Sequence, residues 1–243
     1  MAIIDFFDRG WRSNPTGAAY IQDDRHFSFN EVGELSCQIA NALLATGMPK
    51  ETKGAVWATN DVTAWTCTLG LWRANMCWIP VGARNAAEEN HYLLDAFDCE
   101  VLFFQKYFSA VVAELKPRLP KVKLWVCIDG ESAELPDAIT LDKWLAGQPT
   151  SKPNIAVDLD DVVMLSGTGG TTGLPKGVMN THRSAQTFCA HFLMTCTYGG
   201  NERPVNLAAA PMTHTAGLLS LPATSRGGTV VVVTKPDPAL EPK

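Results

Sequence analysis

Short apolar runs alternate along the chain with segments whose apolar residues recur at helical spacing. Strands are predicted at residues 18–21, 25–29, 55–58, 77–81, 101–104, 124–128, 162–165, 177–179, 205–210 and 229–233. Helices are predicted at residues 29–46, 62–72, 87–97, 107–116, 141–145 and 181–196. The first helix has a capping box, because Ser28 stands at its start and Glu31 follows in the first turn, and Gly47 ends it.

The alternation of strands and helices predicts an α/β fold with a parallel sheet. Residues 129–158 are rich in Pro, Ser, Lys and Asp, so we expect a surface crossover with one short helix there. We place a subdomain boundary after it, with a first α/β subdomain at 1–160 and the start of a second at 161–243. The apolar run 230–233 is expected to leave an exposed edge.

One segment, VVMLSGTGGTTGLPKGV at residues 162–178, joins a buried strand to a loop of Gly, Thr and Ser. Glycines let a ligand approach the backbone, and successive N–H groups form a nest for an anion. With threonine hydroxyls and Lys176 added, the segment predicts a phosphate-binding loop. It is not a Walker loop, because Lys176 lies between Pro175 and Gly177. The dinucleotide-binding pattern G-x-G-x-x-G also fails, because Thr172 stands at the position where that pattern requires its third glycine.

Residues 168–178, TGGTTGLPKGV, resemble the signature loop of the acyl-adenylate-forming, or AMP-binding, superfamily. Its members include acyl- and aryl-CoA synthetases, luciferase-type enzymes and adenylation domains of peptide synthetases. The resemblance implies that phosphate is bound by Thr168, Gly169, Gly170, Thr171, Thr172, Gly173 and Lys176. It also implies the fold of the family's N-terminal domain, a layered sandwich rich in parallel sheet, which is incomplete here. A looser resemblance extends over essentially the whole chain.

A second motif, PMTHTAGL at residues 211–218, resembles the family's Pro-x-x-His-x-x-Gly segment. The resemblance implies that His214 lies beside the carboxylate substrate and the path of the pantetheine thiol; a local role in a turn is the alternative. The family also commonly has a histidine at the position of His182, where packing or capping explains it at least as well as catalysis. His191 is expected at the surface or an interface, and neither of these two histidines has the partner spacing of a metal site.

The resemblance implies an ATP-dependent carboxylate–CoA ligase. A carboxylate oxygen attacks the α-phosphorus of ATP to give acyl-AMP and pyrophosphate, and the thiol of coenzyme A then displaces AMP. Mg²⁺ and Lys176 would stabilise the carboxylate and the departing pyrophosphate. The family's Y-G-x-[ST]-E and T-G-D segments, which hold AMP, metal and ribose, do not occur in this sequence. We therefore expect the N-terminal part of a larger ligase, with weak or no catalysis on its own.

Three alternatives stay open. A nucleotide-binding module without catalysis would bind ATP without turning it over. An adenylation enzyme with another acceptor would share only the first step. A P-loop NTPase would release orthophosphate rather than pyrophosphate, although the sequence around Lys176 argues against it. The sequence does not identify the carboxylic acid.

Composition restricts the class of protein further. The chain has 243 residues, a net charge of −5 and no basic block, so nothing suggests binding to nucleic acid or to an anionic membrane. The longest apolar runs are too short for a membrane span, and the N-terminus lacks the features of a signal peptide. Seven scattered cysteines without a C-x-x-C pair indicate buried free thiols in a reducing cytoplasm rather than disulfides or a metal site. The oligomeric state is open, with a homodimer among the options.

Overall fold

The computed structural model describes residues 1–168 and 176–234. The strands are β1 (Ala18–Gln22), β2 (Arg25–Ser28), β3 (Lys53–Trp57), β4 (Cys77–Ile79), β5 (Cys99–Phe104), β6 (Leu124–Cys127), β7 (Ile139–Thr140), β8 (Val162–Thr168), β9 (Lys176–Thr181), β10 (Val205–Ala208) and β11 (Thr229–Val232). The helices are α1 (Ile4–Ser13), α2 (Phe29–Ala45), α3 (Val62–Arg73), α4 (Ala87–Ala96), α5 (Ser109–Leu115), α6 (Leu141–Leu145), α7 (His182–Thr195) and α8 (Thr215–Ser225). Short 3₁₀ turns, η1 (Lys106–Phe108) and η2 (Lys116–Arg118), flank α5.

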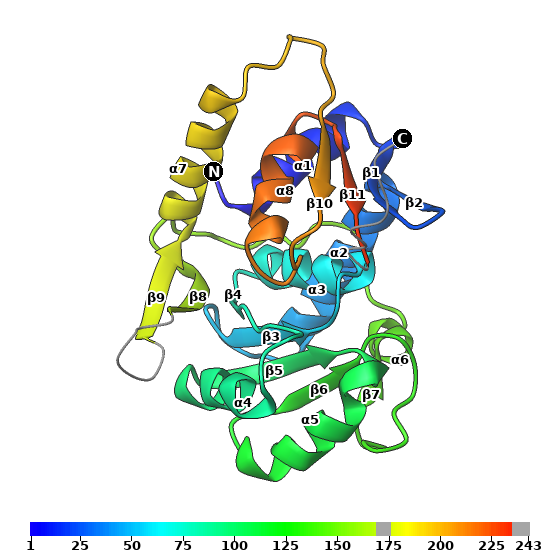
Figure 1. Cartoon of the computed structure of the whole chain (residues 1–243), viewed down its shortest axis with the longest axis vertical. Helices are drawn as coiled ribbons and strands as arrows, with labels where there is room; N and C mark the ends of the chain where they lie inside the picture. Colours follow the sequence, from blue (N-terminus) through cyan, green and yellow to red (C-terminus); the bar gives the residue numbers. More distant parts are fainter. Residues whose placement is uncertain (169–175, 235–243) are drawn as a thin grey trace.

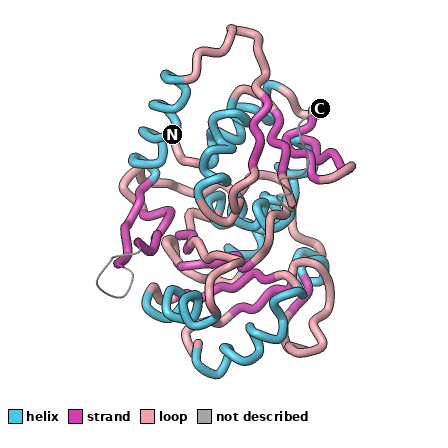
Figure 2. The backbone as a smooth tube through the Cα atoms, in the orientation of Figure 1, coloured by secondary structure: helices cyan, strands magenta, loops and turns pink. Residues whose placement is uncertain are grey.

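These strands form two sheets. The larger has seven strands in the order β7-β6-β5-β3-β4-β8-β9, and the smaller has four in the order β10-β11-β1-β2. Helices α2 and α3 lie between the two sheets, and α4 and α5 cover the opposite face of the larger one (Figure 1). Figure 2 shows the long irregular segment that leads from α6 back to β8, as expected for a surface crossover. The predicted α/β class is confirmed.

The central strands of the larger sheet are buried on both faces, which explains why they are continuous apolar runs. Val56 of β3 and Phe103 of β5 pack into the core shared with α2 and α3. Their neighbours Trp57 and Phe104 point to the other side, into the core beneath α4 and α5. Successive side chains of a strand alternate between faces, so one run supplies both cores.

Three tryptophans join the layers. The rings of Trp65 and Trp72 on α3 and Trp78 on β4 contact each other edge to face, with centroids 5.4 to 5.9 Å apart. Trp65 Nε1 donates to the Tyr20 hydroxyl of β1 at 2.8 Å, and Trp72 Nε1 donates to the Val163 carbonyl of β8 at 2.9 Å. Helix α3 is thereby fixed to a strand of each sheet.

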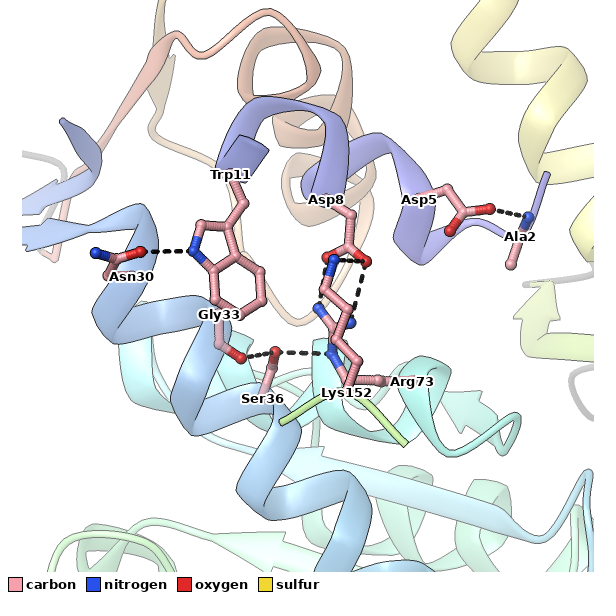
Figure 3. A network of polar contacts seen from close by, with 9 residues as sticks. All are labelled: Ala2, Asp5, Asp8, Trp11, Asn30, Gly33, Ser36, Arg73 and Lys152. Carbon is pink, nitrogen blue, oxygen red and sulfur yellow. Dashed lines mark hydrogen bonds and ion pairs between the residues drawn. The ribbon is translucent and has the colours of Figure 1, made fainter. Parts of the chain in front are cut away.

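A buried ion pair holds α1 against α3 (Figure 3). Arg73 donates from both terminal nitrogens to Asp8, at 2.8 and 3.2 Å, and its Nε donates to Ser36 at 3.0 Å. Lys152 adds a second cation 2.7 Å from Asp8 and lies over the Trp11 ring. Burial would raise the pKa of Asp8, but the two cations outweigh it and lower that pKa. Helix α1 was not predicted from the sequence.

Several sequence predictions are confirmed. The capping box of α2 forms, since Ser28 and Glu31 bond reciprocally, and α6 has the predicted bounds. The larger sheet is not wholly parallel, because β9 returns antiparallel to β8. Helix α8 and strand β7 were missed. The division at residue 160 stays a prediction.

The exposed edge predicted at residues 230–233 is wrong. Val230 and Val232 are buried, because β11 lies inside the smaller sheet between β10 and β1. The exposed apolar strand is β10, at the edge of that sheet, where Val205 is 72% exposed and Leu207 is 68% exposed.

All seven cysteines are free, and all but the half-buried Cys196 are buried, which confirms the expectation of buried free thiols. Within residues 1–168 and 176–234, none of the helices combines the length and apolar character needed to cross a membrane.

Candidate functional site

The β8–β9 hairpin carries the predicted phosphate loop. Thr168 ends β8 and Lys176 begins β9, and the two are paired across the hairpin. The Thr168 hydroxyl donates to the Lys176 carbonyl oxygen at 3.2 Å, and both residues are exposed. Five of the predicted phosphate-binding residues lie outside the described residues: Gly169, Gly170, Thr171, Thr172 and Gly173. The structure therefore places the two ends of the loop side by side at one end of the larger sheet.

A buried polar network fixes the base of this hairpin. Asp161, just before β8, accepts from Lys50 Nζ at 2.5 Å and from the Asn75 amide at 2.8 Å. The hydrogen bond from Lys50 lowers the pKa of Asp161 to about 2. Asn75 has a φ of 55°, a left-handed conformation that asparagine tolerates better than most residues. Its side chain reaches in turn toward the first residue of α7, His182.

His182 belongs to this network and not to an exposed site. Its Nδ1 accepts from the Ile3 N–H at 3.1 Å, and its Nε2 lies 3.0 Å from Asn75 Oδ1. Since Nδ1 accepts, Nε2 carries the proton and donates to Asn75. Burial lowers the pKa of His182 to about 4, so the ring is neutral at physiological pH. Thr181, not His182, caps α7, which leaves packing as the observed role of His182, while His191 is exposed as predicted.

His214 stands immediately before α8, on a segment anchored from the larger sheet. The Asn60 amide donates to the carbonyls of Ala210 and Val233 at 3.1 and 2.9 Å, and its oxygen accepts from the Met212 N–H at 2.8 Å. The Thr213 hydroxyl donates to the Val81 carbonyl at 3.2 Å. These bonds tie the segment to the residues that follow β3 and β4.

Close packing requires a glycine at Gly217 of the same motif. A Cβ on Gly217 would lie 2.2 Å from the Trp65 ring and 2.3 Å from the Met212 carbonyl oxygen. Only glycine lets α8 approach α3 this closely. The His214 imidazole itself is exposed, with Nδ1 2.8 Å from the Thr215 hydroxyl.

A cavity of about 150 Å³ brings the two sequence motifs together. Its walls include Ser166 and Gly167 of β8 and, from the second motif, His214. The remaining lining residues come from the segment after β4 and from α4: Pro80, Gly82, Asn85, Glu89 and Leu93. Sequence analysis did not assign Asn85 or Glu89 to the site, because no local signal shows that α4 starts beside the signature strand.

A larger cavity of about 1000 Å³ opens at the carboxyl ends of strands from both sheets. It is lined by Gln22, Ala58, Thr59, Asn60, Asp61, Ala83, Arg84, Gln105, Tyr107, Phe108, Ala209, Ala210, Pro211 and Thr234. Open α/β sheets usually bind ligands in the crevice outside their carboxyl strand ends, and this volume suits a small-molecule ligand. Asn60 and its neighbour Pro211 join this cavity to the segment that carries His214.

The described part of the chain offers no group of three or more His, Cys, Asp or Glu side chains placed to hold a metal ion.

Comparison with known proteins decides the family. The model of the AMP-binding enzyme family matches residues 7–243 of this chain. The chain belongs to that family. The predicted resemblance to this family and to its acyl- and aryl-CoA ligases is confirmed.

Family members similar to this chain include two aryl-CoA ligases. A feruloyl-CoA synthase from Amycolatopsis is 27% identical over 230 residues, which cover 93% of this chain and 43% of that enzyme. A 4-hydroxybenzoate–CoA/benzoate–CoA ligase from Rhodopseudomonas palustris is 26% identical over 218 residues, covering 89% of this chain and 40% of that enzyme. The chain thus spans less than half the length of these relatives.

The fold agrees with a solved member of the family. The anthranilate CoA ligase AuaEII, in complex with anthranoyl-AMP, superposes with a TM-score of 0.88 at 19% identity. The match covers 97% of this chain and 45% of that enzyme. The N-terminal domain of FACL13 from Mycobacterium tuberculosis matches with a TM-score of 0.80 at 22% identity, over 97% of this chain and 58% of that chain, so the chain has the fold of such an N-terminal domain.

Proposed function

We propose that this chain is the N-terminal part of an ATP-dependent carboxylate–CoA ligase. The observation that carries the proposal is the meeting of two distant motifs at one cavity. Ser166 and Gly167, at the end of the signature strand, share that cavity with His214. A phosphate-binding loop and a histidine beside the acid are the two elements that joining a carboxylate to ATP would need on one surface.

The β8–β9 hairpin is proposed to bind the phosphates of ATP. In this proposal Thr168 and Lys176 flank the polyphosphate, and Gly169, Gly170, Thr171, Thr172 and Gly173 complete the loop. Backbone N–H groups and a lysine would stabilise the charge that builds up on the departing pyrophosphate. Each hydrogen bond to a charged oxygen contributes roughly 1.5–3 kcal/mol.

The acid is proposed to lie beside His214. The cavity of about 150 Å³ is too small for a whole acyl-adenylate, but it adjoins residues of the larger one of about 1000 Å³ through Pro80–Gly82 and Ala83. Asn60 would position His214 by holding residues 210 to 212. When bound, Mg²⁺ neutralises phosphate charge and coenzyme A supplies the acceptor thiol.

The finer identity of the enzyme is also proposed. The acid is placed in the aromatic or fatty class, since the relatives named above act on aromatic acids and others are fatty-acid ligases. A cytoplasmic location is proposed from the buried free thiols. The alternative, an adenylation enzyme with another acceptor, is supported by a match to a linear gramicidin synthase from Brevibacillus parabrevis.

The deciding experiment is carboxylate-dependent ATP–pyrophosphate exchange, run on this chain and on the longest product of its gene. We expect exchange with an aromatic or fatty acid in the longer product and little or none in this chain. Lys176→Ala should abolish exchange, and His214→Ala should raise the KM for the acid. ATP binding without exchange in either protein would favour a nucleotide-binding module, and release of orthophosphate would favour an NTPase.

A further inference from the structure

A second polar cavity lies at the opposite end of the smaller sheet from the candidate site. It has a volume of about 490 Å³ and is lined by Arg9, Ser13, Gly200, Asn201, Glu202, Arg203, Ser225 and Arg226. Arg203 precedes β10 and Arg226 precedes β11, so the cavity faces the amino ends of these strands. The cavity of about 1000 Å³ contains Ala209 and Thr234, which follow the same strands. The two cavities are therefore separate.

Three parts of the chain that are distant in sequence form this cavity. Arg9 and Ser13 come from α1, and Ser225 and Arg226 come from the end of α8. The rest belongs to the irregular segment that crosses from α7 to β10 at the top of Figure 2. Three guanidinium groups and one carboxylate line it, giving a formal charge of +3 − 1 = +2 in a chain whose net charge is −5.

The carboxylate does not neutralise these arginines. Glu202 accepts from the backbone N–H of Gly199 at 2.8 Å, and no ion pair joins it to an arginine among the described residues. The Arg9 side chain makes no hydrogen bond or ion pair with any residue in the described ranges, and the Arg203 side chain makes one hydrogen bond, to Asn14, at 3.1 Å. Two of the three guanidinium groups therefore keep most of their donors free.

Arg226 is held in place and yet is incompletely bonded. Its Nη2 donates to the Gly199 carbonyl at 2.6 Å, and its guanidinium lies 5.5 Å from the centre of the Tyr198 ring. Its Nε is buried without a hydrogen-bond partner in the part of the chain described. A buried N–H without a partner costs free energy, so such groups usually meet a ligand or water.

The ends of α1 and α8 explain only part of this charge. A helix C-terminus carries roughly half a negative charge and favours a nearby cation. The C-termini of α1 and α8 together balance about one positive charge. The cavity therefore keeps an excess of positive charge that a further anion could balance. Fixed guanidinium groups from different elements match the oxygens of phosphate, because arginine binds two oxygens at once.

We propose that this cavity binds a phosphate group, presented either as a free anion or on the headgroup of an anionic phospholipid. Arg9 and Arg203 contact the phosphate oxygens, and Arg226 anchors the wall of the site. The proposal does not depend on the ligase function, since it concerns the other end of the sheet.

The test compares two arginines of the same helix. Arg9 and Arg12 are both exposed and carry the same charge, but of the two only Arg9 lines the cavity. Binding of inorganic phosphate is measured by titration calorimetry at low salt for the chain and for Arg9→Gln, Arg203→Gln and Arg12→Gln. Each protein also carries Lys176→Ala, which removes the lysine of the predicted phosphate loop. A second arm measures co-sedimentation with phosphatidylcholine vesicles, with and without an equal part of phosphatidylglycerol.

We expect Arg9→Gln and Arg203→Gln each to weaken binding roughly tenfold, the loss of about one charge-assisted hydrogen bond, and Arg12→Gln to leave it unchanged. This pattern with inorganic phosphate identifies a free anion as the ligand. The same pattern only with phosphatidylglycerol vesicles identifies a lipid headgroup. Equal effects of Arg9→Gln and Arg12→Gln, or no binding in either arm, would overturn the proposal. A native circular dichroism spectrum of each variant excludes misfolding as the cause.

Discussion

His182 Nε2 lies 3.0 Å from Asn75 Oδ1, and this contact joins the first residue of α7 to the turn after α3 across 107 positions of sequence. Asn75 passes the connection on to Asp161 at the start of β8. Both ends of the β8–β9 hairpin are thus tied to one buried point. The hairpin carries the predicted phosphate loop, so its orientation depends on residues that lie far from any phosphate.

Replacing this histidine should loosen the hairpin locally. His182→Ala leaves Asn75 and the Ile3 N–H without partners and opens a cavity, so we expect a loss of about 2–4 kcal/mol in the free energy of unfolding. Chemical denaturation measures the loss, and amide hydrogen exchange locates it. Faster exchange should be confined to β8, β9 and the N-terminal residues. The exposed His191→Ala serves as the control and should change stability by less than about 0.5 kcal/mol. Uniformly faster exchange over both sheets would contradict a local role.

Stability should fall on mild acidification. The pKa of His182 is lowered from 6.5 to about 4 by burial, so the unfolded chain binds a proton at this residue between those values and the folded chain does not. The stabilisation is present above pH 6.5 and declines as the pH falls toward 4, by about 3 kcal/mol in total. The pKa of Asp161 is also lowered, from 3.8 to about 2, which adds a separate loss of stability only below about pH 4. Denaturation midpoints between pH 7 and 4 test this, and in His182→Gln the slope should flatten.

Asn60 should stabilise the protein by holding residues 210–212 in place. Asn60→Ala removes three hydrogen bonds, to Ala210, Met212 and Val233, and we expect about 1–3 kcal/mol of destabilisation. Asn60→Asp keeps the acceptor for the Met212 N–H but loses both donors and sets a carboxylate against two carbonyl oxygens. It should therefore cost at least as much as alanine. Thermal unfolding of both variants checks the order, and a milder effect of aspartate would show that the Met212 bond dominates.

The exposed face of β10 should promote self-association. Val205 and Leu207 are apolar side chains on an edge strand, and such strands tend to pair with other chains. Replacing both with lysine should lower the concentration-dependent light scattering of the chain and leave its unfolding midpoint nearly unchanged. Val230→Lys in the neighbouring strand is the contrasting variant, because its side chain is buried and it should unfold the protein. Unchanged scattering in the double variant would exclude β10 as the contact.

The structural features that could be predicted from the sequence are those that neighbouring residues determine. The Ser28–Glu31 capping box and the helix Leu141–Leu145 depend on neighbouring residues and are found where expected. Helix α8 was missed because it contains Pro222 and is apolar on most sides, so it shows little helical periodicity. Helix α1 was missed although the buried residues Ile3, Phe7 and Gly10 recur at helical spacing. Its pairing of Asp8 with Arg73 is a contact that no local pattern shows.

The same division holds for the candidate site. Lys176 and His214 were proposed from motifs whose residue types suit the chemistry, and His214 does lie near the signature strand. Asn85 and Glu89 complete that cavity only because β4 pairs with β8, which brings α4 alongside. The direction of β9 depended on the length of the connecting loop, which apolar periodicity does not report.

The smaller sheet has a consequence for how the chain folds. Strand β1 pairs with β11, so Tyr20 cannot pair with Val230 until synthesis has passed β11 and that strand has emerged. Until then the β1–β2 hairpin has only its own pair, and an isolated hairpin is marginally stable in water. Pairings between such distant segments form slowly and leave apolar surface uncovered meanwhile. The nascent protein is therefore most exposed to aggregation and chaperone capture in the interval between the synthesis of β2 and that of β11, a period set by translation speed.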